Sequence, residues 1–235
     1  LMYELASNHI AINVLIDDLK RSEKLGAQYL IIHCGRRLDR DLKCALKSVS
    51  DAINFAFDKV DNGVILLLEN TAGQGSEIGF KFTQIRRILE GLENQEKVGL
   101  CLDTAHAFQA GYAISHPKGL ERMLSEIDSE IGLNKIRLIH LNDSKTPCGS
   151  RIDRHWHIGE GRIGALGIKF IICHPLLQHL PAIMETPRKT DRDDLKNMYA
   201  VKKIAVLPGS QNINAPHRRS RAQGLHVLHH LSLIH

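Results

Sequence analysis

A carboxylate and an imidazole stand two residues apart in the polar stretch between Arg151 and Gly161. In an extended backbone, the side chains of Asp153 and His155 would project to the same side of the chain. Converging in this way, they could supply two ligands of a zinc ion. The alternative is a solvated surface loop, and these residues alone do not decide between the two.

Further candidate ligands lie at the ends of five short apolar runs, which alternate with segments of helical periodicity. This alternation is typical of a parallel sheet built from βα units. The runs predict strands over residues 28–33, 64–68, 98–102, 135–139 and 181–184. The polar residues at their ends are His33, Glu69, Asp103, His140 and Glu185. Because catalytic groups of parallel α/β folds lie at the C-terminal ends of strands, we expect these side chains to surround one mouth.

His106 lies one turn beyond Asp103, so the two can share a face if the chain coils there. With Asp153 and His155, the candidates then comprise four imidazoles and four carboxylates. This mixture suits zinc, suits manganese and iron less well, and does not suit magnesium or calcium. Since one zinc takes about four ligands, eight residues with shared carboxylates indicate two or three ions. Clustered zinc ions are suited to phosphoryl chemistry, because they acidify water and hold phosphate oxygens.

The length of 235 residues fits one large domain, such as an α/β barrel, or at most two small ones. No run is apolar enough to cross a membrane, and no secretory signal is visible. The five cysteines are odd in number and none form a C-x-x-C pair, which favours a reducing, intracellular setting over a disulfide framework. The net charge of +5 arises beyond Asp194, where lysines and arginines meet no acidic residue. The charge is therefore not by itself a sign of a DNA-binding face.

Helical periodicity predicts helices over about 8–25, 41–60, 82–91, 117–132, 163–172 and 189–205. We expect a barrel domain over residues 1–206. Residues 207–235 form an irregular tail rich in basic residues and histidine, for which we expect disorder or non-native sequence. The chain opens at Leu1 directly before a helical pattern, as if it began within a longer fold.

Four motifs resemble those of endonuclease IV, the zinc-dependent apurinic/apyrimidinic endonucleases of DNA base-excision repair. The resemblance runs from about residue 8 to about residue 205. The motifs are Glu69-Asn-Thr-Ala-Gly-Gln-Gly-Ser76, Cys101-Leu-Asp-Thr-Ala-His106, His140-Leu-Asn-Asp143, and Gly149-Ser-Arg-Ile-Asp-Arg-His155 with Gly159-Glu-Gly161. The resemblance implies a TIM barrel with three zinc ions at its C-terminal mouth. It also implies hydrolysis of the phosphodiester 5′ to an abasic site in double-stranded DNA, by a monomer in the cytoplasm that contacts no membrane.

The resemblance implies a role for each candidate ligand. His33 would bind the first zinc, and Glu69 would bridge the first and second. The remaining ligands would be Asp103, His140 and Glu185 for the second zinc, and His106, Asp153 and His155 for the third. Glu69 or Glu185 would position or deprotonate the attacking water, and Arg154 would contact a phosphate. His157 would face the same side as His155, near the ligands or the DNA.

The sequence departs from the family at its front, where three further βα units would precede the strand that ends at His33. We therefore expect an α/β fold that is an incomplete TIM barrel, with about five of eight βα units. The resemblance places another histidine ligand of the first zinc in the absent units, so we expect the zinc around His33 to be lost first. The zinc of His106, Asp153 and His155 would be retained best.

Two other functions stay open. One is a sugar isomerase or epimerase on a related barrel, although such enzymes use mostly carboxylates around one metal. The other is a non-catalytic, truncated remnant that binds zinc weakly.

Overall fold

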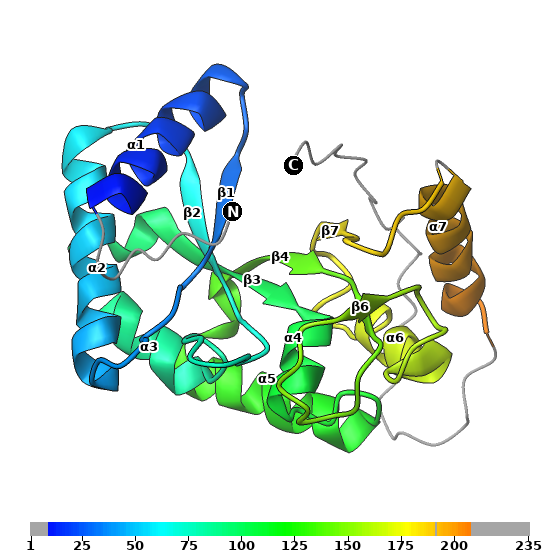
Figure 1. Cartoon of the computed structure of the whole chain (residues 1–235). Coiled ribbons are helices and arrows are strands. Elements are labelled where there is room, and N and C mark those ends of the chain that lie inside the picture. The colour runs from blue at the N-terminus through cyan, green and yellow to red at the C-terminus, as the bar shows by residue number, and fades with distance from the viewer. Residues whose placement is uncertain (1–8, 191, 208–235) are drawn as a thin grey trace.

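The computed structural model describes residues 9–190 and 192–207. Within them, five parallel strands form one sheet in the order β1-β2-β3-β4-β7 (Figure 1). The strands are β1 (Tyr29–His33), β2 (Ile65–Glu69), β3 (Val98–Asp103), β4 (Ile136–His140) and β7 (Ala182–Ile183). The predicted α/β fold with five strands of a TIM barrel is confirmed.

The register of the sheet aligns the strand ends. His33 lies opposite Glu69, and Asp103 lies opposite His140. Each of these residues is the last of its strand, and Glu185 follows β7 closely. The polar residues that end the apolar runs are thus brought to one edge of the sheet.

Helices return the chain between strands and pack against one another in chain order. They are α1 (His9–Lys24), α2 (Leu42–Lys59), α3 (Phe82–Glu90), α5 (Pro117–Glu130), α6 (Gly164–Ile172) and α7 (Arg192–Ala205). In Figure 1, α1 and α2 lie at one end of the molecule and α6 and α7 at the other. Short 3₁₀ turns, η1 (Gln95–Lys97) and η2 (Leu133–Lys135), lead into β3 and β4. None of the helices among the described residues has both the length and the apolar character needed to cross a membrane.

Some details of the predicted elements differ. A short helix, α4 (Thr104–Ala110), begins immediately after β3, so the chain does coil at His106. The last helix begins at Arg192 and not at residue 189, because Asp193 accepts hydrogen bonds from the backbone N–H groups of Lys189 and Thr190 and closes a turn there. A small antiparallel ribbon of β5 (Asp143–Ser144) and β6 (His155–Trp156) was not predicted. The predicted tail, apart from residue 207, lies outside the described residues.

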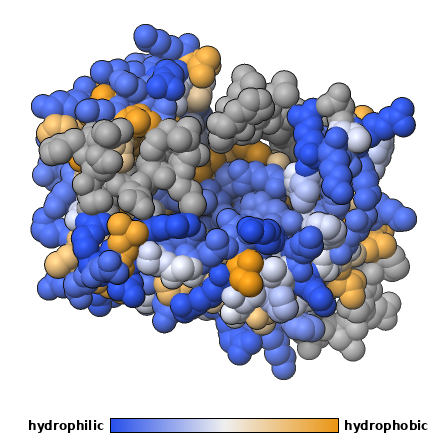
Figure 2. All heavy atoms as spheres, viewed as in Figure 1, coloured by the Kyte–Doolittle hydropathy of each residue, from blue (hydrophilic) through white to orange (hydrophobic). Residues whose placement is uncertain are grey.

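The two faces of the sheet are covered unequally. On one face, alternate residues such as Leu66, Leu68 and Leu100 are buried in a large core with the helices. On the other face a small cluster of Leu67, Cys101 and Leu138 is flanked by apolar side chains that are only partly buried. Period-two alternation produces both faces, because successive strand residues project to opposite sides. In Figure 2 the visible face is hollowed near its centre, with hydrophilic residues gathered around the hollow.

Candidate metal centre

Glu69 lies at the centre of the candidate ligands and is surrounded by three imidazoles. Its Oε1 lies 2.9 Å from Nδ1 of His140 and 3.3 Å from Nδ1 of His106. Its Oε2 lies 3.3 Å from Nε2 of His33. The ligand atoms of His33, Glu69 and His106 lie within 4.8 Å of one another. Because its two oxygens face different histidines, this carboxylate is well placed to bridge two ions.

A second group consists of Glu69, Asp103, His140 and Glu185, whose ligand atoms also lie within 4.8 Å of one another. Nδ1 of His140 is 3.2 Å from Oε2 of Glu185 and 3.9 Å from Oδ2 of Asp103. Four strands of the sheet contribute these side chains, one from the end of each of β2, β3 and β4 and one from beyond β7. Three carboxylates and one imidazole at this spacing could hold a divalent cation.

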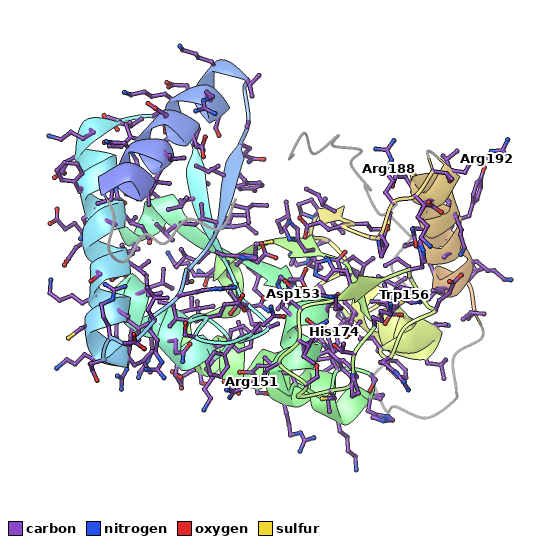
Figure 3. All side chains as sticks on the ribbon, viewed as in Figure 1. Arg151, Asp153, Trp156, His174, Arg188 and Arg192 are labelled. Atoms are coloured by element: carbon purple, nitrogen blue, oxygen red, sulfur yellow. The ribbon has the colours of Figure 1, made fainter. Side chains whose placement is uncertain are left out.

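A third group joins α4 to the β5–β6 ribbon. Nε2 of His106 lies 3.2 Å from Nε2 of His155, and each is close to Oδ1 of Asp153, at 3.3 Å and 3.5 Å respectively. Asp103, His106 and His155 again have ligand atoms within 4.8 Å of one another. Two imidazole nitrogens that face each other at this distance need a proton or a cation between them. Figure 3 shows Asp153 near the middle of the molecule.

The charges of the centre are mutually dependent. Burial alone would lower the pKa of His106, but Asp103, Asp153 and Glu69 raise that pKa well above 6.5. The pKa of His140 is raised well above 6.5 in the same way, against burial, by the neighbouring Cys101, Glu69 and Glu185. Burial would raise the pKa of Glu69, yet the three histidines hold it well below its usual range. Packed carboxylates therefore require compensating positive charge, which protons or divalent cations can supply, so the donor set fits zinc.

Loops beyond the strands position several of these side chains. The carboxylate of Asp103 caps α4 by accepting a hydrogen bond from the backbone N–H of His106 at 2.7 Å. Gln74, in the loop after β2, accepts one from the backbone N–H of Asp153 at 2.9 Å. Nδ1 of His155 lies 3.0 Å from the backbone oxygen of Glu185. Hydrogen bonds of this kind fix the tautomer and orientation of a metal-binding histidine.

Two buried asparagines that the sequence reasoning did not assign also contact the centre. Nδ2 of Asn142 donates to Oδ2 of Asp103 at 2.6 Å, and its Oδ1 accepts from the backbone N–H of Glu185 at 2.7 Å. Asn70 exchanges hydrogen bonds with the backbone of Asp103 in both directions. Both asparagines lie inside the motifs that carry the family resemblance, but their residue type alone gave no role.

Cys101 also lies beside Glu69 and His140, with ligand atoms within 4.8 Å of one another. Burial raises the pKa of its thiol to about 12. Because the thiolate and not the thiol binds metals, this cysteine is a poor ligand at neutral pH.

The structure separates two predicted residues from the cluster of ligand atoms. Arg154 is exposed, and its Nη1 donates to the backbone oxygen of Asp153 at 2.6 Å. His157 does not turn to the ligands. Its Nδ1 lies 3.2 Å from Nδ2 of Asn197, so its ring faces α7.

Comparisons with known proteins show which family the chain belongs to. The family model described as "Xylose isomerase-like TIM barrel" matches residues 8–204. A probable endonuclease 4 from Halothermothrix orenii is 45% identical over 183 residues, which cover 78% of this chain and 66% of that protein. One from Methanoculleus marisnigri is 41% identical over 196 residues, which cover 83% of this chain and 70% of that protein.

Among solved structures, endonuclease IV from Thermus thermophilus superposes with a TM-score of 0.73 and 29% identity. The match covers 86% of this chain and 72% of that one. A D-tagatose 3-epimerase-like protein has a TM-score of 0.66 at 18% identity, which shows a shared fold alone. The chain spans about two thirds of the length of the relatives it matches. From its motifs, its sheet and these likenesses, the chain belongs to the endonuclease IV family of xylose isomerase-like TIM barrel proteins.

Proposed function

We propose that the chain is a zinc-dependent endonuclease that hydrolyses the phosphodiester 5′ to abasic sites in double-stranded DNA. The observation that carries this proposal is the convergence of four imidazoles and four carboxylates at and beyond the strand ends of a family member. The relatives named probable endonuclease 4 support a DNA substrate. We further propose that the chain acts as a monomer in the cytoplasm.

The three groups of side chains suggest how zinc would be held. His33 and Glu69 would hold one ion, and Glu69 would share a second with Asp103, His140 and Glu185. A third ion would be held by His106, Asp153 and His155. Bound zinc would acidify a water molecule and neutralise the charge of the phosphate.

Glu185 is the better of the two candidate bases. The side chain of Glu185 is 39% exposed, whereas that of Glu69 is 5% exposed and enclosed by histidines. Oε2 of Glu185 faces His140, so Oε1 is the oxygen that can accept a proton from an attacking water. Glu69 would instead hold the three imidazoles in place. The exposed guanidinium of Arg154 would contact a phosphate of the DNA.

The test is incision of a duplex that carries one abasic site, with zinc and with a chelator. We expect incision on the 5′ side of the lesion with zinc and none with the chelator. His140→Ala removes an imidazole that lies beside the carboxylates of Glu69, Asp103 and Glu185, and it should lower the rate by about a hundredfold or more. His174→Ala is the matched control, because His174 pairs with Glu121, which is not one of the candidate ligands, and its loss should leave the rate within about twofold.

The result that would contradict the proposal is aldose–ketose turnover without incision, which would indicate a sugar isomerase. Folded, zinc-loaded protein that incises nothing would also contradict it. If the two histidine variants lost incision rate equally, His140 would have no specific role in incision.

A further inference from the structure

A pocket of about 290 Å³ lies beside the candidate metal centre, on the other side of the β5–β6 ribbon. Its lining residues are Lys145, Trp156, Glu160, Gly161 and Arg162. His155 and Trp156 are neighbours in β6, so their side chains project to opposite faces of the ribbon. In Figure 3, Trp156 lies toward α7, whereas Asp153 lies nearer the middle of the molecule. The pocket adjoins the centre but shares none of its eight side chains.

The floor of this pocket is fixed by backbone hydrogen bonds. Asp143 accepts hydrogen bonds from the backbone N–H groups of Gly159 and Gly161, both at 3.0 Å. The N–H of Arg162 donates to the backbone oxygen of Ser144 at 2.7 Å. A Cβ at Gly161 would collide with Asp143, so only glycine allows the loop to lie this close to the ribbon. The backbone that lines the pocket at Gly161 and Arg162 is therefore held in place against the ribbon.

The pocket combines an aromatic ring with positive charge. Nζ of Lys145 lies 4.4 Å from the centroid of the Trp156 ring. Glu160, the one acidic residue of the lining, pairs with Lys196 at 2.7 Å and so does not neutralise the pocket. Within the described part of the chain, neither Lys145 nor Arg162 has a carboxylate partner. Unpaired cations beside an aromatic ring select a ligand that is both flat and anionic.

We infer that this pocket binds one unpaired nucleotide of a DNA strand. The base stacks on Trp156, and the phosphate pairs with Lys145 and Arg162. Lys145 is exposed, so its ammonium can leave the ring for a phosphate when a base takes its place. The inference rests on the proposed function for its choice of DNA, and it adds a contact next to the ligand His155.

Trp156 is the only tryptophan in the chain, so its fluorescence reports on this pocket alone. The experiment titrates the full chain, freed of metal by a chelator, with single-stranded (dA)6. We expect saturable quenching, because a stacked base contacts the indole directly. Inorganic phosphate at the same concentration should not quench, since it has no ring to stack.

The matched variants separate the pocket from general charge. The double variant K145A/R162A should raise the Kd for (dA)6 by about tenfold or more, because it removes both phosphate contacts. The double variant K43A/R87A removes the same charges from exposed positions on α2 and α3, at the far end of the molecule from α6 and α7, and should change the Kd by less than about twofold (Figure 1). Far-UV circular dichroism confirms that each variant is folded.

Absence of quenching in the unaltered chain would overturn the inference, and so would an equal loss of affinity in the two double variants. Equal quenching by inorganic phosphate and by (dA)6 would show an anion site only, and it would overturn the inference as well. Incision of abasic duplex with zinc, measured separately, tests the proposed function. Incision without quenching would contradict nucleotide binding in the pocket and support the proposed function. Quenching without incision would support nucleotide binding and contradict the proposed function.

Discussion

Two buried asparagines, Asn70 and Asn142, brace the carboxylates of the candidate metal centre. The amide of Asn142 contacts the side chain of Asp103 through its nitrogen and the backbone of Glu185 through its oxygen. Asn70 ties the backbone of Asp103 to β2. Because hydrogen bonds fix where each carboxylate points, the site is oriented by the protein before an ion binds.

Replacing Asn142 with aspartate should weaken zinc binding. The new carboxylate would put an oxygen against Oδ2 of Asp103, where the amide now donates at 2.6 Å. We expect zinc affinity to fall by about tenfold or more, measured by competition with a chromophoric chelator. Asn197→Asp is the matched control, since Asn197 is 1% exposed and Asn142 is 0% exposed, and the amide of Asn197 contacts none of the eight candidate ligands. Equal losses in the two variants would rule out a specific role for Asn142.

At this scale, the strand-end ligands were the predictable part. An apolar run that ends on a histidine or a carboxylate can be recognised in the sequence. Parallel topology then brings the ends of such strands to one edge of the sheet. The bracing asparagines were not predictable, because asparagine after a strand is an ordinary turn residue. Their partners, such as Asp103 for Asn142, lie on a neighbouring strand and become visible only in the structure. The metal-binding roles of the eight side chains stay predictions.

A single carboxylate organises the loop that joins the β5–β6 ribbon to α6. Asp143 is fully buried, and its two oxygens accept hydrogen bonds from the backbone N–H groups of Ser144, Gly159, Gly161, Ile163 and Gly164. Without Asp143, the N–H groups of Ser144 and Ile163 would be buried without a partner, and those of the three glycines would be partly buried without one. The ribbon carries His155, so the same carboxylate indirectly supports the candidate metal centre.

Asp143→Ala should therefore destabilise the fold. The buried N–H groups of Ser144 and Ile163 and the partly buried ones of three glycines would lose their acceptor at once, at a cost of about 3 kcal/mol in the free energy of unfolding. Denaturation by urea, followed by circular dichroism, measures this difference. Asp51→Ala removes an exposed carboxylate that pairs only with Lys47, so its effect should stay below about 1 kcal/mol. If D143A lowers the free energy of unfolding no more than D51A does, water must hydrogen-bond the backbone N–H groups of the loop in place of Asp143.

The long helices and strands could be predicted because each repeats its period several times. The ribbon could not, since strands of two residues have no period to detect. Asp153 and His155 were expected in one extended segment, whereas only His155 lies in a strand, with Asp153 in the loop before it. Both side chains still converge on His106, because the turn is held by Gln74.

At the scale of the molecule, the described residues form an open sheet with two unpaired edges. Among the described residues, β1 pairs only with β2, and β7 pairs only with β4. The face opposite the helices keeps Tyr29, Ile31 and Ile183 only partly buried. Apolar surface and free strand edges of this kind attract further chain or small apolar molecules.

We expect this chain to enhance the fluorescence of the dye ANS in its native state. Ile31→Lys places a charge on the exposed face of an edge strand and should reduce the enhancement by about half or more. Leu25→Lys, at an exposed position away from the sheet, should leave it nearly unchanged. Wild-type emission no higher than that of free dye would show that the apolar face is covered in solution.

The incomplete barrel was predictable from the sequence because five βα units could be counted and four motifs placed in order. The burial of the sheet face opposite the helices could not be predicted. It depends on how strongly the sheet curves, which the sequence does not show.

The order of the strands has a consequence for how the protein is made. Each strand of the sheet pairs with the strand that precedes it along the chain, apart from the small ribbon between β4 and β7. A ribosome releases the chain from its N-terminus, so every new strand meets a template that is already in place. His106, Asp153 and His155 emerge before Glu185 does. The third group of candidate ligands can therefore assemble on the nascent chain, whereas the second is completed only when Glu185, beyond β7, has emerged.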